Sequence, residues 1–216
     1  MGATSGRGLS PDIASPDIAW SDHRIRFFTK LVTGKRVLDI GCVEHDREKF
    51  ESPYWVHRAL TRVAKSIVGL DYDEAGVAFL RENGFNILIG DACDFDLGET
   101  FDVIVAGDVI EHLDNTGGFL KSCRRHLNPG GMLLVTTPNP WYWRHIAKAV
   151  VRGRVQSNVE HVCWIDPVLL GQLAARHGFA LREDEVEYGT REWFNRILPL
   201  PTMVKHSTYH AILRPV

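Results

Sequence analysis

Short apolar segments alternate with longer segments of helical periodicity through most of the chain. Five of the apolar segments have the length and the aliphatic composition of buried strands. They span residues 36–40, 67–71, 86–89, 102–106 and 132–137. Between successive segments, apolar residues recur every three or four positions, as they do on one face of a helix. The pattern therefore predicts parallel strands joined by right-handed helical crossovers.

Three helices are expected between these strands. The first carries an apolar stripe formed by Val56, Ala59, Leu60 and Val63. The second spans residues 73–83 and stops at Gly84, a residue type that commonly follows a helix. The third lies around residues 119–127, ahead of a turn at residues 128–131 that contains Pro-Gly-Gly.

The two ends of the chain differ from this alternating middle. Residues 1–16 predict a flexible arm, and a helix is expected to start near Asp17. A later helix should begin at Asp166-Pro167 and end at Gly178, followed by strands at 180–188 and 208–213. We therefore predict an α/β fold with a doubly wound, mostly parallel, seven-stranded Rossmann-like sheet. Helices cover both faces, the last strand is antiparallel, and residues 17–216 form one domain with a lid or acceptor insertion around 140–165.

Composition and charge narrow the class of protein. The 216 residues are 44% hydrophobic and carry a net charge of −2, which lacks the basic excess of nucleic-acid-binding proteins. No apolar run approaches the length of a membrane span or a signal peptide, so a cytoplasmic location is expected. The four cysteines form no C-x-x-C pair, which argues against a zinc cluster and favours a reducing compartment.

Acidic residues that could bind a ligand lie at the carboxyl ends of the predicted strands. In open α/β sheets, ligands bind outside the carboxyl ends of the strands. The first, second and fourth strands end at or near Asp39, Asp71 and Asp108, and Asp91 follows the third. Four carboxylates at successive strand ends exceed what packing requires and predict a ligand site there.

Six short fragments follow one another in a fixed order along the chain. They are VLDIGC (37–42), VGLD (68–71), GDA (90–92), FDVIV (101–105), VIEHL (109–113) and LNPGG (127–131). The order and spacing of these fragments resemble class I S-adenosylmethionine-dependent methyltransferases, and the chain looks most like the small-molecule branch that includes the ubiquinone O-methyltransferases. The resemblance covers roughly residues 35–180.

The resemblance implies S-adenosylmethionine as the cofactor and suggests a role for each strand end. Asp71 would accept hydrogen bonds from the ribose hydroxyls, and Tyr72 would pack beside the adenine. Asp91 would accept a hydrogen bond from the adenine amine, with the Ala92 amide nearby. The methionine part of the cofactor would lie against Asp39, Gly41, Cys42, Gly107 and Asp108. The chain departs from the family at residues 43–54: residues 43–46 stand where the family has a glycine-rich loop, and residues 47–54 are expected to form an extra loop over the cofactor.

The resemblance also implies transfer of a methyl group to a hydroxyl oxygen of a small-molecule, sugar or lipid-linked acceptor, with no metal ion. His161 and His112 are the candidate general bases, because imidazoles suit proton removal near neutral pH. Asn139, Tyr142 and Trp143 are expected to line the acceptor side.

Several alternatives remain open. Asp108 and Glu111 have the spacing of a capping box, so they could serve only a short helix. The two histidines could be structural, and the aromatic residues at 141–143 could be ordinary core. The chain could instead methylate a nitrogen, or bind the cofactor as a silent partner subunit. A nicotinamide-dependent dehydrogenase is disfavoured, because G-x-G-x-x-G is missing after the first strand.

A basic segment follows the fifth predicted strand and has two interpretations. Arg144, Lys148, Arg152 and Arg154 alternate with aliphatic residues, as in a basic amphipathic helix. We expect this segment to form a lid helix that also rests on anionic lipid or on an anionic acceptor. The alternative is a solvated helix face. The chain is expected to be a monomer or a homodimer.

Overall fold

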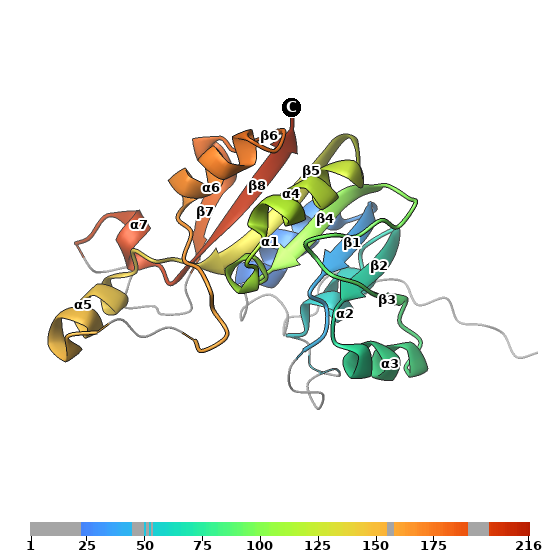
Figure 1. The fold of residues 1–216 in the computed structure, drawn as a ribbon, viewed down its shortest axis with the longest axis horizontal. Coiled ribbons are helices and arrows are strands. Elements are labelled where there is room, and N and C mark those ends of the chain that lie inside the picture. The colour runs from blue at the N-terminus through green and yellow to red at the C-terminus, as the bar shows by residue number, and fades with distance from the viewer. Residues whose placement is uncertain (1–22, 45–49, 51, 53, 155–157, 190–198) are drawn as a thin grey trace, which may run out of the picture.

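A computed structural model describes residues 23–44, 50, 52, 54–154, 158–189 and 199–216. The expected flexible arm and the helix expected near Asp17 lie outside the described residues. The first described helix is α1, His23–Val32. Figure 1 shows a twisted central sheet with helices packed against it.

The parallel part of the sheet follows the predicted alternation. It contains β1 (Arg36–Ile40), β2 (Ser66–Asp71), β3 (Ile87–Ile89), β4 (Phe101–Gly107) and β5 (Leu127–Pro138). The strand order is β3-β2-β1-β4-β5-β8-β6, and the first five pair in parallel. The order reverses at β1 and β4, which places a ligand-binding crevice beside the ends of these two strands. β5 begins earlier than expected, because the segment interpreted as a turn at residues 128–131 belongs to it.

The C-terminal strands add the antiparallel edge. β8 (Thr208–Pro215) runs antiparallel to β5, and both β6 (Phe179–Ala180) and β7 (Val186–Gly189) pair antiparallel with β8. The prediction of one strand at 180–188 was wrong in this detail, so the described residues contain eight strands instead of seven. A short 3₁₀ helix, Glu183–Glu185, interrupts the strand. The buried Glu185 carboxylate accepts a hydrogen bond from the Arg182 backbone N–H at 3.4 Å and pairs with Arg214.

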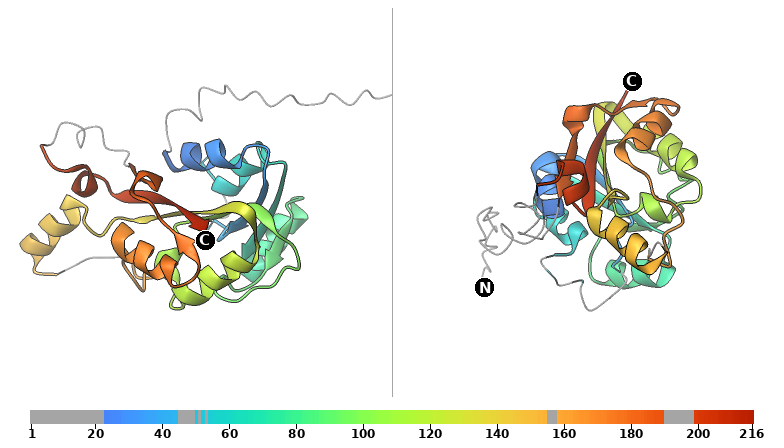
Figure 2. Two further views of the ribbon diagram at one scale, coloured as in Figure 1. Left: turned by 90° about the horizontal axis from the view of Figure 1, so that it is seen from above. Right: turned by 90° about the vertical axis from the view of Figure 1, so that its left-hand side faces the viewer.

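Helices cover both faces of the sheet, as Figure 2 shows from two further directions. On one face, α1 and α2 (Val56–Thr61) pack on a core that includes Phe28, Leu60 and Val103. On the other face, α4 (Thr116–Arg125) and α6 (Pro167–Ala175) pack on a core that includes Ile104. Successive residues of β4 thus face opposite layers, as strand geometry requires.

The remaining helices flank the sheet. α3 (Glu74–Glu82) follows β2, and its N-cap Asp73 accepts a hydrogen bond from the Ala75 N–H at 3.1 Å. α6 begins as predicted, with the Asp166 carboxylate accepting from two backbone N–H groups, but it ends at Ala175, before Gly178. α5 (Trp143–Arg152) and α7 (Thr202–Lys205) project from the end of the molecule opposite α3 (Figure 1).

Candidate functional site

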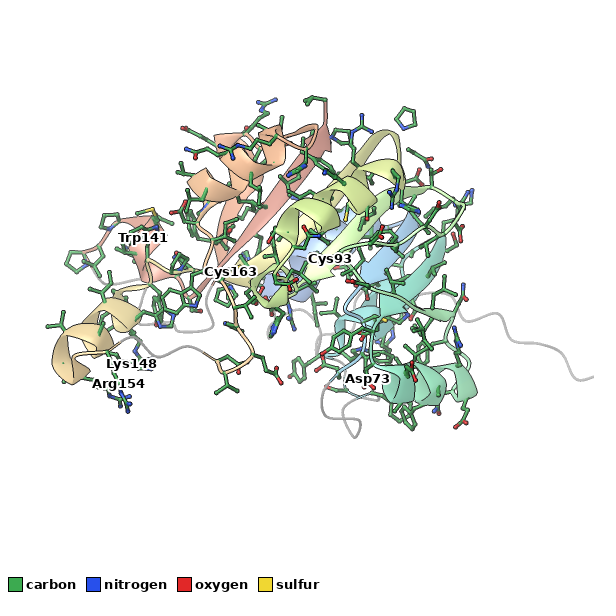
Figure 3. All side chains as sticks on the ribbon, viewed as in Figure 1. Asp73, Cys93, Trp141, Lys148, Arg154 and Cys163 are labelled. Atoms are coloured by element: carbon green, nitrogen blue, oxygen red, sulfur yellow. The ribbon has the colours of Figure 1, made fainter. Side chains whose placement is uncertain are left out.

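A cavity of about 850 Å³ opens at the carboxyl ends of β1, β2 and β4. Several predicted cofactor residues line it, and His112 and Glu160 lie on its wall. The predicted cofactor residues among its lining are Gly41, Asp71, Tyr72, Asp91, Ala92 and Asp108. Figure 3 labels two further lining residues, Asp73 beside α3 and Cys93 near the centre of the view. The topology therefore brings three of the four predicted carboxylates, Asp71, Asp91 and Asp108, to one cavity, whereas Asp39 does not line it.

Gly41 lets the chain turn sharply at the end of β1. Its φ is +71°, a region that side chains rarely adopt, and its N–H donates to the Leu70 carbonyl at 2.9 Å. A Cβ at this position would lie 2.5 Å from a methyl carbon of Val109. A glycine is therefore required to keep backbone against the cavity at this point.

Asp71 is held in place by the backbone around it. Its Oδ2 accepts from the Val43 N–H at 2.9 Å, and its Oδ1 accepts from the Asp73 N–H at 3.0 Å. Burial raises the pKa of this carboxyl, while the hydrogen bonds from backbone N–H groups oppose the rise. A carboxylate has about four lone-pair sites, so capacity remains for a ligand. Tyr72, 78% exposed, stands beside it on the same cavity.

Residues 54–57 anchor the segment that replaces the glycine-rich loop. The Trp55 indole N–H donates to the Cys42 carbonyl at 2.8 Å. The His57 Nδ1 lies 2.9 Å from Asp39 Oδ2, and both side chains are buried. Residues 45–49, 51 and 53 lie outside the described part of the chain, so the expected loop over the cofactor stays a prediction. The pairing of Asp39 with His57 was missed by sequence reasoning, because nothing in the pattern links two residues 18 positions apart.

Asp39, Cys42 and Gly107 lie beside the main cavity and do not line it. They border a separate space of about 40 Å³ together with Arg24, a residue of α1. The His57 Nε2 is buried without a hydrogen-bond partner among the described residues. Contact of these three predicted residues with the cofactor stays a prediction.

Asp108 links the N-terminal helix to the end of β4. Its carboxylate pairs with the Arg24 guanidinium and accepts from the Thr136 hydroxyl at 3.1 Å. Its φ of +56° makes it the one described residue other than glycine with a positive φ. The capping-box interpretation of Asp108 and Glu111 was wrong: Val109 is the N-cap of the 3₁₀ helix Ile110–His112, with no side-chain capping bond. Asp108 instead lies in the sharp turn that follows β4 and lines the cavity.

Glu111 is a buried acid at the side of the cavity. Its Oε2 accepts from the Thr137 hydroxyl at 2.9 Å, and its Oε1 is buried without a partner among the described residues. Burial, with a smaller contribution from the charge of Asp108, raises the pKa of Glu111 to about 7. Sequence reasoning treated this residue as a possible cap and missed its burial, although its position beside a histidine after β4 was a usable signal.

The two candidate bases are neighbours in space. The His112 and His161 rings have centroids 4.8 Å apart and meet edge to face. The His112 Nδ1 lies 3.2 Å from the Glu160 carbonyl oxygen. Partial burial and the nearby His112 lower the pKa of His161, against the opposing influence of Asp108 and Glu160. A neutral imidazole therefore stands next to a histidine of the cavity wall.

Glu111 lies close to the two histidines, His112 and His161. One ligand atom from each of Glu111, His112 and His161 lies within 4.8 Å of the other two, a spacing that could hold a cation. The expectation from the sequence that no metal ion is needed stays a prediction. The arrangement can accept a proton from a bound hydroxyl group.

The predicted acceptor residues lie away from this cavity. Asn139 is buried, and its side-chain amide donates to the Met203 and His206 carbonyls while accepting from the Trp141 N–H. Tyr142 is also buried, and Trp143 begins α5. None of the three is among the residues that line the 850 Å³ cavity. In Figure 3, Trp141 lies at the opposite end of the molecule from Asp73. An acceptor role for Asn139, Tyr142 and Trp143 stays a prediction.

Comparisons with known proteins agree with this geometry. A family model described as a methyltransferase domain matches residues 17–184. A probable S-adenosylmethionine-dependent methyltransferase of Mycolicibacterium smegmatis is 28% identical, over 90% of this chain and 81% of that protein. A ubiquinone biosynthesis O-methyltransferase of Bradyrhizobium diazoefficiens is 32% identical over 55% of this chain, a match that spans 45% of that relative.

Solved structures share the fold. The CcbJ methyltransferase of Streptomyces caelestis has a TM-score of 0.64 at 17% identity, covering 89% of this chain and 88% of that one. A SAM-dependent methyltransferase of Archaeoglobus fulgidus has a TM-score of 0.63 at 18% identity, covering 88% and 90%. At these identities the likeness establishes the architecture alone. With the family match over most of the chain, the protein belongs to the methyltransferase domain family, the S-adenosylmethionine-dependent methyltransferases with a Rossmann-like fold.

Proposed function

We propose that this methyltransferase transfers a methyl group to a hydroxyl oxygen of a small-molecule, sugar or lipid-linked acceptor. The observation that carries the proposal is the pair of histidines beside the cavity, with His112 on the wall and His161 against its ring. An acceptor hydroxyl must lose its proton as the new bond to the methyl carbon forms. A neutral imidazole at this position is suited to receive it.

The residues at the strand ends fit the cofactor. S-adenosylmethionine supplies an electrophilic methyl group when it is bound. Asp71 is a fixed carboxylate that can accept hydrogen bonds from neighbouring ribose hydroxyls, and Tyr72 offers an exposed ring beside it. Asp91 and Ala92 lie further along the same cavity and would hold the adenine edge. This leaves the sulfur end near Gly41, Asp108 and His112.

His161 is proposed as the general base because of its place and its lowered pKa. His161 lies in the connection between α5 and α6, and the lowered pKa of its imidazole favours the neutral form at neutral pH. The acceptor oxygen would give its proton to an imidazole nitrogen of His161 while the bond between oxygen and the methyl carbon forms. The neighbouring His112 ring, itself 3.2 Å through its Nδ1 from the Glu160 carbonyl oxygen, would orient the His161 ring.

The test compares His161→Ala with His112→Ala in two measurements. Transfer of labelled methyl groups to a panel of hydroxylated aromatic and lipid-linked acceptors gives turnover, and calorimetry with S-adenosylhomocysteine gives cofactor affinity. Loss of a positioned base should lower turnover by roughly 10²- to 10⁴-fold with cofactor affinity nearly unchanged. Full turnover in His161→Ala would move the base to His112 or remove it from the mechanism.

The same experiment separates the two alternatives. A neutral amine acceptor can attack without prior loss of a proton, so an N-methyltransferase should tolerate His161→Ala far better. A silent partner subunit should bind S-adenosylhomocysteine and transfer no methyl group to any acceptor. The names of the ubiquinone biosynthesis relatives favour oxygen, although they match little more than half of this chain. A chelator added to the wild-type assay tests the expectation that no metal ion is needed.

The location and oligomeric state of the chain also stay predictions. We expect a cytoplasmic monomer or homodimer. In the described part of the chain, no helix has both the length and the apolar character needed to cross a bilayer.

A further inference from the structure

α5 is a helix without a buried residue. It follows the buried Asn139 and Tyr142, and it projects from the end of the sheet opposite α3 (Figure 1). Its aliphatic side chains are open to solvent: Val150 is 79% exposed, Val151 is 84% exposed and Ile146 is 46% exposed. Amphipathic helices of globular proteins normally bury such residues against a core. The apolar face of α5 is therefore turned away from the protein's own core.

The helix has two distinct faces. Trp143, Ile146, Ala147 and Val150 follow the i, i+3, i+4, i+7 spacing of one face, and Val151 borders them. Arg144, Lys148 and Arg152 follow the i, i+4, i+8 spacing of another, and all three are exposed. The Arg144 guanidinium lies 5.7 Å from the centre of the Trp143 ring. In Figure 3, Lys148 and Arg154 lie close together below α5.

The segment is positive without any compensating acid of its own. Residues 141–154 contain four Arg or Lys side chains and no Asp or Glu, although the whole chain has a net charge of −2. Its neighbourhood adds apolar surface. Asn139, just before α5, is hydrogen bonded to the Met203 carbonyl of α7. Trp141 and Met203 are 46% and 41% exposed.

We propose that the α5 surface, made of residues 141–154 with Met203 of α7, binds anionic lipid bilayers. Basic amphipathic helices with an aliphatic and tryptophan-bearing face lie in the plane of the headgroups. There the aliphatic side chains enter the acyl boundary, and the long basic side chains reach the lipid phosphates. This inference goes beyond the proposed chemistry and does not depend on which acceptor is methylated.

Charge decides between a lipid surface and a second copy of the chain. In a two-fold dimer the same patch meets itself, so residues 141–154 of both copies would face each other. That contact would bring together eight cations with no acid of the segment to neutralise them. Anionic headgroups supply the opposite charge. The surface is therefore complementary to an anionic membrane and not to itself.

The test is co-sedimentation of the full chain with phosphatidylcholine vesicles, with and without phosphatidylglycerol. Wild type should bind the anionic vesicles and release them as salt is raised, because the attraction is screened. Arg144→Gln/Lys148→Gln should weaken binding by about fivefold for each charge removed. Val150→Asp/Val151→Asp should abolish binding, because charged groups would replace the aliphatic contact.

Matched variants elsewhere control for general effects. Lys30→Gln/Lys121→Gln removes two exposed cations from α1 and α4, and Val168→Asp changes an exposed aliphatic residue of α6. Both should bind like wild type, and circular dichroism should show that every variant is folded. Equal binding to neutral and anionic vesicles, or equal binding by the α5 variants and wild type, would overturn the proposal. It would also be overturned by a dimer in solution that Val150→Asp/Val151→Asp dissociates, since that result would assign the surface to a second copy.

Discussion

The cofactor edge of the sheet and the α5 surface differ in how firmly the fold holds their side chains. At the edge, polar groups are held by the fold: Asp71 accepts two backbone N–H groups, and Asp39 is paired with buried His57. At α5, no residue is buried and the aliphatic side chains face solvent. The edge is thus built to hold one ligand in one geometry. The α5 surface instead presents exposed aliphatic and basic side chains, which suits contact with a fluid or variable partner.

Loss of the carboxylate at the end of β2 should have the largest effect on the cofactor edge. Asp71→Ala removes two charge-assisted hydrogen bonds to ribose hydroxyls, each contributing roughly 1.5–3 kcal/mol. Affinity for S-adenosylhomocysteine, measured by calorimetry, should therefore fall by about two orders of magnitude or more.

Two further variants make this result specific. Asp94→Ala removes an exposed acid that does not line the cavity, and the affinity of this variant should match that of wild type. Asp71→Asn keeps the shape of the side chain and guards against a local folding defect. Unchanged affinity in Asp71→Ala would contradict the assignment of the ribose site.

His57 should matter for stability and for the cofactor edge at once. His57→Ala removes a buried partner of Asp39 and leaves a buried carboxylate without its hydrogen bond. Urea unfolding should show a loss of about 1.5–3 kcal/mol for this bond to a charged group. A double-mutant cycle with Asp39→Asn should show coupling, whereas strictly additive effects would mean that the two side chains act independently.

Glu111 should make the stability of the fold depend on pH. Its pKa is about 7 in the folded chain against an ordinary value of 4.5, so between these values the folded state keeps a proton that the unfolded chain releases. The stabilising contribution is complete below about 4.5, falls as the pH rises and is lost above about 7. Glu111→Gln keeps an acceptor for Thr137 and cannot ionise.

The difference in unfolding free energy between pH 5 and pH 8 should therefore be smaller in Glu111→Gln than in wild type. Other titrating groups are common to both proteins and cancel in this comparison. Identical pH profiles from urea unfolding would show that Glu111 is already ionised near pH 5 in the folded chain.

Changes on α5 should have the smallest effect on stability. Val150→Ser/Val151→Ser alters two exposed side chains, so thermal unfolding in the absence of lipid should change by no more than about 0.5 kcal/mol. Affinity for S-adenosylhomocysteine should also be unchanged, because α5 does not line the cavity. A large loss of stability would mean that α5 packs on the body of the protein, and would remove the contrast between the two regions.

The sequence by itself determined the parts of this protein that depend on local pattern. The buried strands β1 to β5 follow from aliphatic runs, and α6 begins at Asp166-Pro167 because that pair satisfies the first N–H groups of a helix. Parallel strands must end at one edge, so the sequence alone is enough to assign Asp71, Asp91 and Asp108 to one cavity. The amphipathic character of α5 also follows from the sequence, because residues three or four positions apart lie on the same face of a helix.

Only the tertiary structure decided which side chains meet. His57 reaches Asp39, Glu111 is buried against Thr137, and the Asn139 amide is occupied by carbonyls more than 60 positions later. The 3₁₀ interruption between β6 and β7 likewise involves Glu185 and Arg214. Burial and hydrogen bonding between residues far apart in the chain arise from the packing of whole elements, and periodicity along a sequence carries no record of them.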